Sequence, residues 1–390
     1  MAPGLGVMGE KPAAATTKHL SLGSMASGLR EAYESGRTKD MEWRQSQLRG
    51  LISLLTDKEE EIFDVLHEDL GKHRGESFRD ELGILVKSVK YTLQNLKKWA
   101  APEKAEAPLV AFPATAMVVP EPLGVVLIFS CWNFPLGLAL EPLSGALAAG
   151  NAVVLKPSEL APSTAAFLAA NIPKYLDSRA VKVVLGGPNV GEELMEHRWD
   201  KLLFTGSERV GRIIMTKAAK HLTPIELMKS TLKRFMAKPG GMARILNEKH
   251  FQRLSAYLED TKVKKIEDSI AFLKPKPKPL AIYAFTTNES LKRRIVEETS
   301  SGSVTFNDAV VQYALESVPF GGVGHSGFGQ YHGKYSFELF SNKKAVFRRS
   351  FLIEFMFRYP PWDDSKIGTL RHVFSYSYIL LFLTLLGLRR

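Results

Sequence analysis

Polar side chains that could hold a charged ligand follow two apolar runs in the middle of the chain. Trp132 and Asn133 come after the first run, and Lys156 and Glu159 come after the second. In open α/β sheets, ligands bind beyond the carboxyl ends of the strands. If the two runs are neighbouring parallel strands, these four side chains lie at one ligand-binding edge, where Lys156 supplies a cation that can donate hydrogen bonds.

The elements that would position these side chains form one strand–helix–strand unit. Residues Val125 to Ser130 are short, apolar and bounded by turn residues, which is typical of a strand buried on both faces. The Ala- and Leu-rich segment that follows stops at Gly150, as expected just past a helix C-terminus. A second strand is expected at Ala152 to Leu155. This spacing predicts a βαβ unit of a parallel sheet.

The alternation of strands and helices continues beyond Glu159 and predicts a doubly wound sheet. We expect helices at Ala161–Leu176, Asn189–His197 and Glu208–Leu222, and strands at Val181–Leu185 and Lys201–Thr205. Gly206 would let the backbone approach a ligand, and the amides of the next helix could hold a phosphate. Because there is no GxGxxG, an ordinary strand–helix turn stays open as an alternative.

Composition limits the classes of protein to consider. The chain has 390 residues, a net charge of +11 and 45% hydrophobic residues, which suits a globular protein of two domains. The basic residues are dispersed rather than interleaved with aromatics, so no nucleic-acid partner is expected. The single cysteine, Cys131, forbids an intrachain disulfide, as is usual in a reducing compartment.

Four ordered motifs carry a family resemblance: CWNFP, AAGNAVVLKPSE, LLFTGSERVGR and PFGGVGHSGFG. Together they resemble the NAD(P)-dependent aldehyde dehydrogenase superfamily, and in particular its fatty-aldehyde branch, over most of residues 29 to 347. The resemblance implies an α/β fold with a doubly wound, parallel, Rossmann-type cofactor domain and an α/β catalytic domain that is truncated here.

The implied organisation has five parts. They are a disordered arm (1–25), a helical lead-in with the NAD(P)-binding domain (26–225), the truncated catalytic domain (226–325), an oligomerisation segment (326–350) and a tail (351–390). Within the lead-in, Thr56 and Glu59 have the spacing of a capping box at a helix start.

The resemblance also assigns site residues, with NAD or NADP as cofactor and no metal. Lys156 and Glu159 would meet the adenosine ribose, and Gly206 and Ser207 would lie near the pyrophosphate. The full implied cofactor set is Trp132, Lys156, Ser158, Glu159, Gly187, Gly206, Ser207 and Val210. Asn133 matches the asparagine that holds the oxyanion, although an asparagine that only fixes the turn after a strand is the alternative.

Two parts of the family chemistry are missing from this chain. In the family, a cysteine thiolate downstream of the cofactor sheet attacks the aldehyde to give a thiohemiacetal, and a glutamate later activates water. The only cysteine here is Cys131. The family's Glu-Leu-Gly-Gly motif is replaced at Glu226, which we interpret as the start of a helix, ELMKSTLKRF. The family-like sequence is interrupted a second time between Val263 and Lys264, so two internal deletions are indicated.

Three hypotheses for the function follow. The first is NAD(P)-dependent oxidation of fatty aldehydes to carboxylic acids through a cysteine thiohemiacetal, impaired in this chain. The second is an inactive variant that binds a nucleotide or pairs with a full-length subunit. The third is failure to fold, because deleted strands would leave unpaired edges. Substitution of the nucleophile by Cys131 is disfavoured, since a small buried thiol is far commoner.

The C-terminal part predicts partners. The family resemblance implies that the loop from Pro319 to Gly329 borders the tunnel for the aldehyde substrate and leads to a strand used in a homodimer, for which Lys344 to Arg348 are the candidate. The uncharged segment Phe374–Leu388 is shorter than a spanning helix but suits attachment to a membrane. The tail resembles that of membrane-anchored fatty aldehyde dehydrogenases, and this resemblance implies the cytosolic face of the endoplasmic reticulum or another endomembrane. A helix lying on the protein itself, in a cytoplasmic protein, is the alternative.

Overall fold

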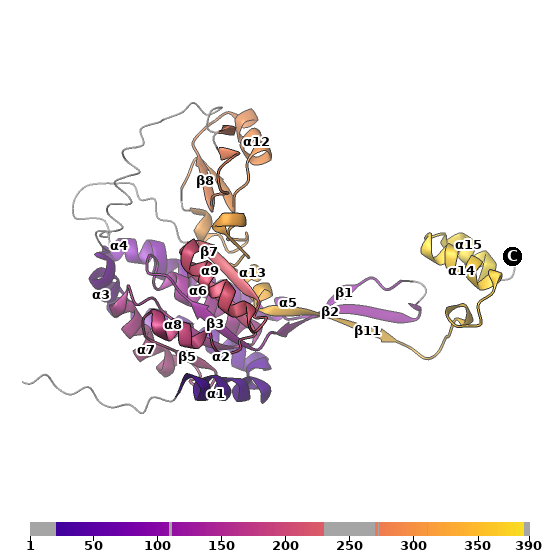
Figure 1. The fold of residues 1–390 in the computed structure, drawn as a ribbon, viewed down its shortest axis with the longest axis horizontal. Coiled ribbons are helices and arrows are strands. Elements are labelled where there is room, and N and C mark those ends of the chain that lie inside the picture. The colour runs from indigo at the N-terminus through magenta and orange to yellow at the C-terminus, as the bar shows by residue number, and fades with distance from the viewer. Residues whose placement is uncertain (1–20, 109–110, 230–269, 272, 310, 386–390) are drawn as a thin grey trace, which may run out of the picture.

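The N-terminal part is a group of helices. The computed structural model describes residues 21–108, 111–229, 270–271, 273–309 and 311–385. The first helices are α1 (Leu22–Glu34), α2 (Met41–Asp57), α3 (Glu59–Leu70), α4 (Arg74–Ser77) and α5 (Gly83–Trp99), with a π turn at Phe78–Leu82 (Figure 1). Helix α1 begins inside the expected arm, where Ser21 Oγ accepts a hydrogen bond from Ser24 N–H.

The helical stripes of the lead-in face the core, as the spacing indicates. Leu48, Leu51 and Leu55 on α2 are fully buried, and so are Ile62 and Leu66 on α3. The expected capping box is wrong. Thr56 lies inside α2, where its hydroxyl donates to the Ile52 carbonyl at 3.0 Å, and Lys58 precedes α3. A threonine hydroxyl satisfied within its own helix cannot cap the next one.

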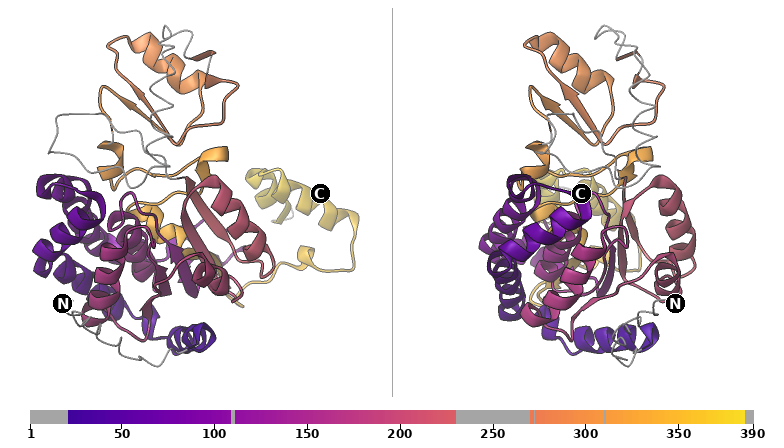
Figure 2. Two further views of the ribbon diagram at one scale, coloured as in Figure 1. Left: turned by 60° about the vertical axis from the view of Figure 1, so that its left-hand side comes forward. Right: turned by 90° about the vertical axis from the view of Figure 1, so that its left-hand side faces the viewer.

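A six-stranded sheet forms the centre of the molecule (Figure 2). Its order is β10–β7–β6–β3–β4–β5, with β3 (Val125–Phe129), β4 (Ala152–Lys156), β5 (Val181–Val183), β6 (Lys201–Gly206), β7 (Ile225–Lys229) and β10 (Gly327–Phe328). The helices between these strands are α6 (Gly137–Ala149), α7 (Pro162–Tyr175), α8 (Pro188–Leu194) and α9 (Glu208–Ala219). The β3 to β7 strands are parallel, which confirms the predicted doubly wound fold.

The stretch around Glu226 corrects the sequence interpretation. It is strand β7, not the start of a helix: Leu203 of β6 faces Glu226, and Leu227 also faces Phe328 of antiparallel β10. Without β7, strand β6 would present an unpaired edge, so sheet pairing outweighs the helical pattern of the local sequence. Residues 230–235 of the expected helix lie outside the described part of the chain.

Two smaller units lie apart from the large sheet (Figures 1 and 2). One contains β8 (Ala281–Ala284), α12 (Glu289–Glu298) and β9 (Ser303–Phe306). The other is an extended arm of β1 (Glu103–Ala105), β2 (Ala114–Pro122) and β11 (Ser341–Arg349), reached through α13 (Lys334–Leu339). Helices α14 (Asp364–Phe374) and α15 (Tyr378–Leu385) lie at the far end of this arm.

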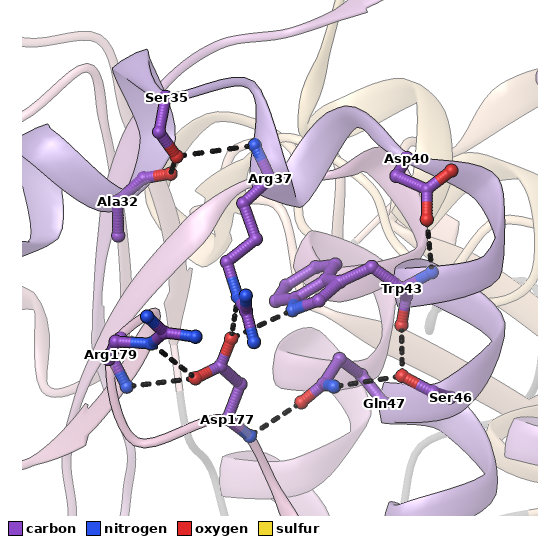
Figure 3. Close-up of polar contacts among 9 residues, drawn as sticks. All are labelled: Ala32, Ser35, Arg37, Asp40, Trp43, Ser46, Gln47, Asp177 and Arg179. Atoms are coloured by element: carbon purple, nitrogen blue, oxygen red, sulfur yellow. Dashed lines mark hydrogen bonds and ion pairs between the residues drawn. The ribbon is translucent and has the colours of Figure 1, made fainter.

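Polar contacts fasten the helical lead-in to the sheet. Asp177, just before β5, accepts hydrogen bonds from the Trp43 indole at 3.0 Å and from the Arg37 guanidinium, while its own N–H donates to Gln47 Oε1 (Figure 3). Burial opposes ionisation of Asp177, but the hydrogen bonds from Trp43 and Arg37 hold the pKa of its carboxyl below the usual value. This junction fixes α2 against the strand that closes the sheet.

The prediction that the tail attaches to a membrane is tested here only for a helix that would span the membrane. Within the described residues, no helix combines the length and apolar composition that crossing a membrane requires. Residues 386–388 of the expected hydrophobic segment lie outside the described part.

Candidate cofactor and aldehyde site

The register of the sheet brings the predicted site residues to one edge. Phe129, near the end of β3, is opposite Lys156 on β4 and Phe204 on β6. Strands β3 and β4 therefore end at the same level, and β6 continues from Phe204 to Gly206 at the same edge of the sheet. From β3 the chain adds β4 and β5 on one side of the sheet and then crosses over to add β6 and β7 on the other side. Open α/β sheets bind their ligands at such a switch point, which here lies between β3 and β6.

Asn133 lies in the turn between β3 and α6. It is only 9% exposed, and its Oδ1 has no hydrogen-bond partner among the described residues. An asparagine that only fixed the turn would use this oxygen, because buried polar atoms are normally paired. The open oxygen is an acceptor and favours a donor group of a ligand here, while the oxyanion role would use the amide N–H of the same side chain. Neighbouring Trp132 lies half-buried against the core.

Lys156 and Glu159 form a pair at the end of β4. Lys156 is 5% exposed, and its ammonium donates to Glu159 Oε2 at 2.7 Å and to the Pro157 carbonyl at 3.2 Å. Glu159 is the more exposed partner. Ser158 lies between them, with its hydroxyl accepting from Leu160 N–H at 3.3 Å. The structure thus brings three of the predicted residues together, with the cation held at the base of the site.

At the starts of α8 and α9, the backbone rather than charged side chains forms this edge of the sheet. Ser207 is the N-cap of α9, and its hydroxyl accepts from Val210 N–H at 3.4 Å. A Cβ at Gly206 would lie 2.4 Å from the Phe204 ring, so a larger residue there would have to displace that ring. Gly187 precedes α8, and a Cβ there would meet nothing within 4 Å. The N-terminus of α9 therefore presents its amides at the carboxyl edge of β6.

Three buried oxygens without partners gather at this edge. Besides Asn133 Oδ1 they are the hydroxyl oxygens of Ser130, just after β3, and Thr205, near the end of β6, counted among the described residues. Buried polar atoms left unpaired in a protein usually have a ligand or water to bind. Sequence reasoning missed Ser130 and Thr205, although a hydroxyl residue closing an apolar strand was the available signal.

The Gly-rich loop packs onto β7. Glu226 Oε1 accepts from Lys201 Nζ at 2.8 Å, while Oε2 has no partner in the described structure. A Cβ at Gly329 would lie 1.2 Å from that Oε2, and Gly329 has φ +93°. At Gly329 the loop therefore needs glycine, both for close packing and for positive φ. His325 in the same loop is exposed and contacts Glu208 Oε1 at 3.2 Å.

The single cysteine lies beside the site but in the interior. Cys131 directly precedes Trp132 and is 6% exposed. The expected break between Val263 and Lys264 lies outside the described residues.

Two buried titratable side chains border this region and were not predicted. Burial, reinforced by Glu316 and opposed by the hydrogen bond from Ser88, raises the pKa of Glu141 on α6 to about 7. Burial lowers the pKa of His332 to about 4. No sequence pattern marked either residue, because their burial depends on contacts between α6 and the segment after the Gly-rich loop.

A separate cavity lies away from this edge. A space of about 570 Å³ near Val125 and Asp200 opens at the amino ends of β3 and β6. It is lined by none of the predicted site residues, and the Arg30–Asp200 ion pair crosses it. The register and the unpaired oxygens, not cavity size, therefore locate the candidate site.

Comparisons with known proteins agree with this geometry. The family model "Aldehyde dehydrogenase family" matches residues 14–232 and 258–346. "Aldehyde dehydrogenase family 3 member F1" of Arabidopsis thaliana is 40% identical over 470 residues, covering 93% of this chain and 97% of the relative. "Aldehyde dehydrogenase family 3 member B1" of Homo sapiens is 34% identical over 451 residues, covering 90% and 96%. Both alignments are longer than this chain, so the relatives contain internal residues that it lacks.

Solved structures give the same result. A substrate-bound AldH of Staphylococcus aureus is similar with a TM-score of 0.85 and 27% identity, covering 91% of this chain and all of that one. A betaine aldehyde dehydrogenase of S. aureus, in complex with NAD+, has the same fold with a TM-score of 0.74 and 18% identity, over 87% and 90% of the two chains.

The fold and site define a dinucleotide-type α/β oxidoreductase scaffold. The chain belongs to the aldehyde dehydrogenase family. This confirms the predicted family and the predicted enzyme class, NAD(P)-dependent aldehyde dehydrogenase.

Proposed function

We propose that this chain binds NAD or NADP at the β3–β6 junction and admits a fatty aldehyde, but turns it over poorly or not at all. The observation that carries the cofactor proposal is the set of unpaired buried oxygens of Ser130, Asn133 and Thr205 beside the N-terminus of α9. The hydroxyls of Ser130 and Thr205 and the amides that begin α9 can donate to an anionic group, whereas Asn133 Oδ1 accepts and suits a donor group of the ligand.

Different residues would bind different parts of the cofactor. Lys156 and Glu159 would hold the adenosine ribose, with Ser158 and Trp132 beside them. The amides that begin α9 would hold the pyrophosphate, bordered by Gly206, Ser207, Val210 and Gly187. When bound, the nicotinamide ring accepts a hydride from the substrate. Asn133 would donate its amide N–H to the aldehyde oxygen and stabilise negative charge there.

The proposed loss of turnover follows from the nucleophile. Family chemistry needs a thiolate close to the oxyanion site, and Cys131 is the only sulfur nucleophile in the sequence. Cys131 is 6% exposed, which leaves little room for an aldehyde. The family match is also interrupted between residues 232 and 258. The alternative, an inactive chain that binds nucleotide or pairs with a full-length subunit, shares the same cofactor site.

Turnover is tested with the purified full chain, a fatty aldehyde and NAD+ or NADP+. We expect no reduced cofactor above the rate of a Cys131→Ser variant. We also expect equal alkylation of Cys131 with and without aldehyde and cofactor. Reduced cofactor that disappears in Cys131→Ser, together with an acyl group trapped on Cys131, would reverse the proposal of impairment.

The partners are proposed from the arm and the tail. Strand β11 contains the predicted segment Lys344–Arg348 and lies at the edge of its sheet among the described residues, so we assign it to a homodimer contact. Exposed Phe374, Ile379 and Phe382 on α14 and α15 suit attachment to the cytosolic face of an endomembrane such as the endoplasmic reticulum. A cytoplasmic protein is the alternative.

A further inference from the structure

A buried ion pair connects the helical lead-in to the turn that carries Asn133. Lys72 donates from its ammonium to Glu81 Oε1, and the two side chains are 1% and 0% exposed. Lys72 follows the α3 C-cap Gly71, which has φ +63°, and its carbonyl contacts His67 Nδ1 at 3.1 Å. Glu81 lies in the π turn between α4 and α5. Such turns recur at functional sites.

The second oxygen of Glu81 holds the start of α6. Glu81 Oε2 accepts the N–H groups of Leu136 and Gly137, both at 2.9 Å. Helix α6 has no side-chain cap at its own N-cap residue. The carboxylate therefore satisfies N–H groups that the helix leaves unpaired, and its charge suits the helix N-terminus.

Lys72 holds the middle of the same turn. Its ammonium lies 4.6 Å from the centre of the Phe134 ring, whose stacked neighbour on another side is Tyr313 at 5.9 Å. A cation over an aromatic ring is attracted to it, most strongly where water is excluded. Phe134 directly follows Asn133, so the turn is fixed by β3 before Asn133 and by the ion pair after it.

We propose that Lys72 and Glu81 are positioning residues that set the orientation of the turn from Cys131 to Leu136. The proposal rests on the proposed function in one respect: the orientation of this turn matters for catalysis because the turn carries Asn133. The contacts themselves involve neither cofactor nor aldehyde. The pair therefore acts through the loop and not on reacting atoms.

The single cysteine gives a local readout. Cys131 begins this turn, so its reaction with a thiol reagent such as DTNB under native conditions reports how often the turn opens. We expect Glu81→Gln and Lys72→Met to raise the reaction rate by at least about tenfold, as expected for a local opening. Lys72→Arg keeps the charge and should restore a rate near that of the wild type.

The matched control breaks a different, largely buried ion pair, which lies within the six-stranded sheet. Lys201→Met removes the partner of Glu226 at the amino end of β6, opposite the turn. We expect it to leave the Cys131 rate within about twofold once global unfolding, measured with urea, is taken into account. Equal acceleration in all three variants, in proportion to lost global stability, would overturn the proposal.

A second measurement needs no variant. In the wild-type chain, the amides of Leu136 and Gly137 should exchange hydrogen more slowly than those of Asn189 and Val190, which begin α8 without a side-chain cap. Equal exchange rates for the two pairs of amides would contradict the proposal that Glu81 holds the start of α6. Both readouts are independent of cofactor binding and turnover, so failure of the proposed function and failure of this inference give different results.

Discussion

At the scale of single residues, Asn151 shows how one buried amide ties the sheet to its surroundings. Its Oδ1 accepts from Gly124 N–H at 2.9 Å, and its Nδ2 donates to the carbonyls of Ala146 at 3.1 Å and Phe340 at 2.9 Å. The side chain joins the start of β3, the end of α6 and the start of the arm. In the sequence it is only the residue after the glycine that stops a helix.

Asn151→Ala should therefore destabilise the whole chain. Gly124 N–H and the Phe340 carbonyl would lose their side-chain partner, whereas the Ala146 carbonyl would keep the backbone N–H of residue 151. The expected loss is about 3 kcal/mol of unfolding free energy. Urea unfolding measures this. The control Asn189→Ala, at an exposed position, should change stability by less than about 0.5 kcal/mol. Similar values for the two variants would contradict the role of Asn151.

Gly329 offers a second test at this scale. An alanine there must displace the Glu226 carboxylate and adopt φ +93°, so Gly329→Ala should cost about 1–3 kcal/mol. Gly187→Ala, where a Cβ meets open space, should be close to neutral in stability. Urea unfolding of both variants checks the close approach of the loop to β7, and a neutral Gly329→Ala would show that it does not occur.

Glu141 and His332 predict opposing effects of pH on stability. The folded pKa of Glu141, about 7, exceeds the ordinary 4.5, so its contribution is full below pH 4.5 and is lost as pH rises to about 7. The folded pKa of His332, about 4, is below the ordinary 6.5, so its contribution is full above pH 6.5 and is lost as pH falls to about 4. Between pH 4.5 and 6.5 the two slopes oppose each other.

Single variants should expose each slope. Glu141→Gln keeps a hydrogen-bond partner for Ser88 and removes the acid, so stability should then fall more steeply on acidification below pH 6.5. His332→Gln should leave stability falling as pH rises from 4.5 to 7, by a total of about 3 kcal/mol. Urea unfolding from pH 4.5 to 7.5 measures both slopes. Parallel curves for the wild type and both variants would contradict these pKa values.

At the scale of elements, periodicity and turn residues predict the sheet well but fail where pairing partners are distant in sequence. The strands at 125, 152, 181 and 201 are confirmed within about two residues because each is an apolar run bounded by turn residues. Strand β7 was missed, since its pattern suits a helix and its partners include Phe328, about 100 residues later. The Lys72–Glu81 pair was missed for the same reason: its contacts to α6 have no local signal.

The location of the candidate site was predicted to a similar extent, while the roles of its residues stay predictions. Motif resemblance placed Asn133, Lys156 and Ser207 at one edge, and the register brings their segments to that edge of the sheet. Ser130 and Thr205 emerged only from the three-dimensional structure, since unpaired buried atoms cannot be recognised without it.

Strand β11 yields a prediction about assembly. Phe347 is 54% exposed on this edge strand, which suits a contact with a second copy. Phe347→Glu should convert a dimer into a monomer, measured by light scattering after size-exclusion chromatography. Phe285→Glu, at a 67% exposed phenylalanine outside the arm, should remain a dimer. A monomeric wild-type chain, or a dimer unaffected by Phe347→Glu, would rule out this contact.

At the scale of the whole molecule, the tail is a separate unit at the end of the arm. Phe357, Val373 and Leu381 form their own small core, while Phe351, Leu352 and Ile379 are largely exposed. This apolar surface joins a chain with a net charge of +11. Apolar contact and attraction to anionic lipid act together at a membrane surface, and salt weakens the second effect.

Flotation with vesicles of phosphatidylcholine and phosphatidylserine tests this assignment. The full chain should float with the vesicles, and less so at high salt. A chain ending at Ser350, which keeps all of β11, should stay at the bottom of the gradient. Equal partitioning of the two chains would leave the cytoplasmic alternative.

The central claim is that the β3–β6 junction grips a dinucleotide although the chain lacks the nucleophile at its family position. Calorimetric titration of the purified chain with NAD+ and NADP+ tests this most directly, with Lys156→Ala as the site variant and Lys182→Ala on β5 as its control. We predict saturable binding of at least one cofactor that is weakened about tenfold or more by Lys156→Ala and unchanged by Lys182→Ala. A folded chain that binds neither cofactor, or binding that ignores Lys156, would contradict it.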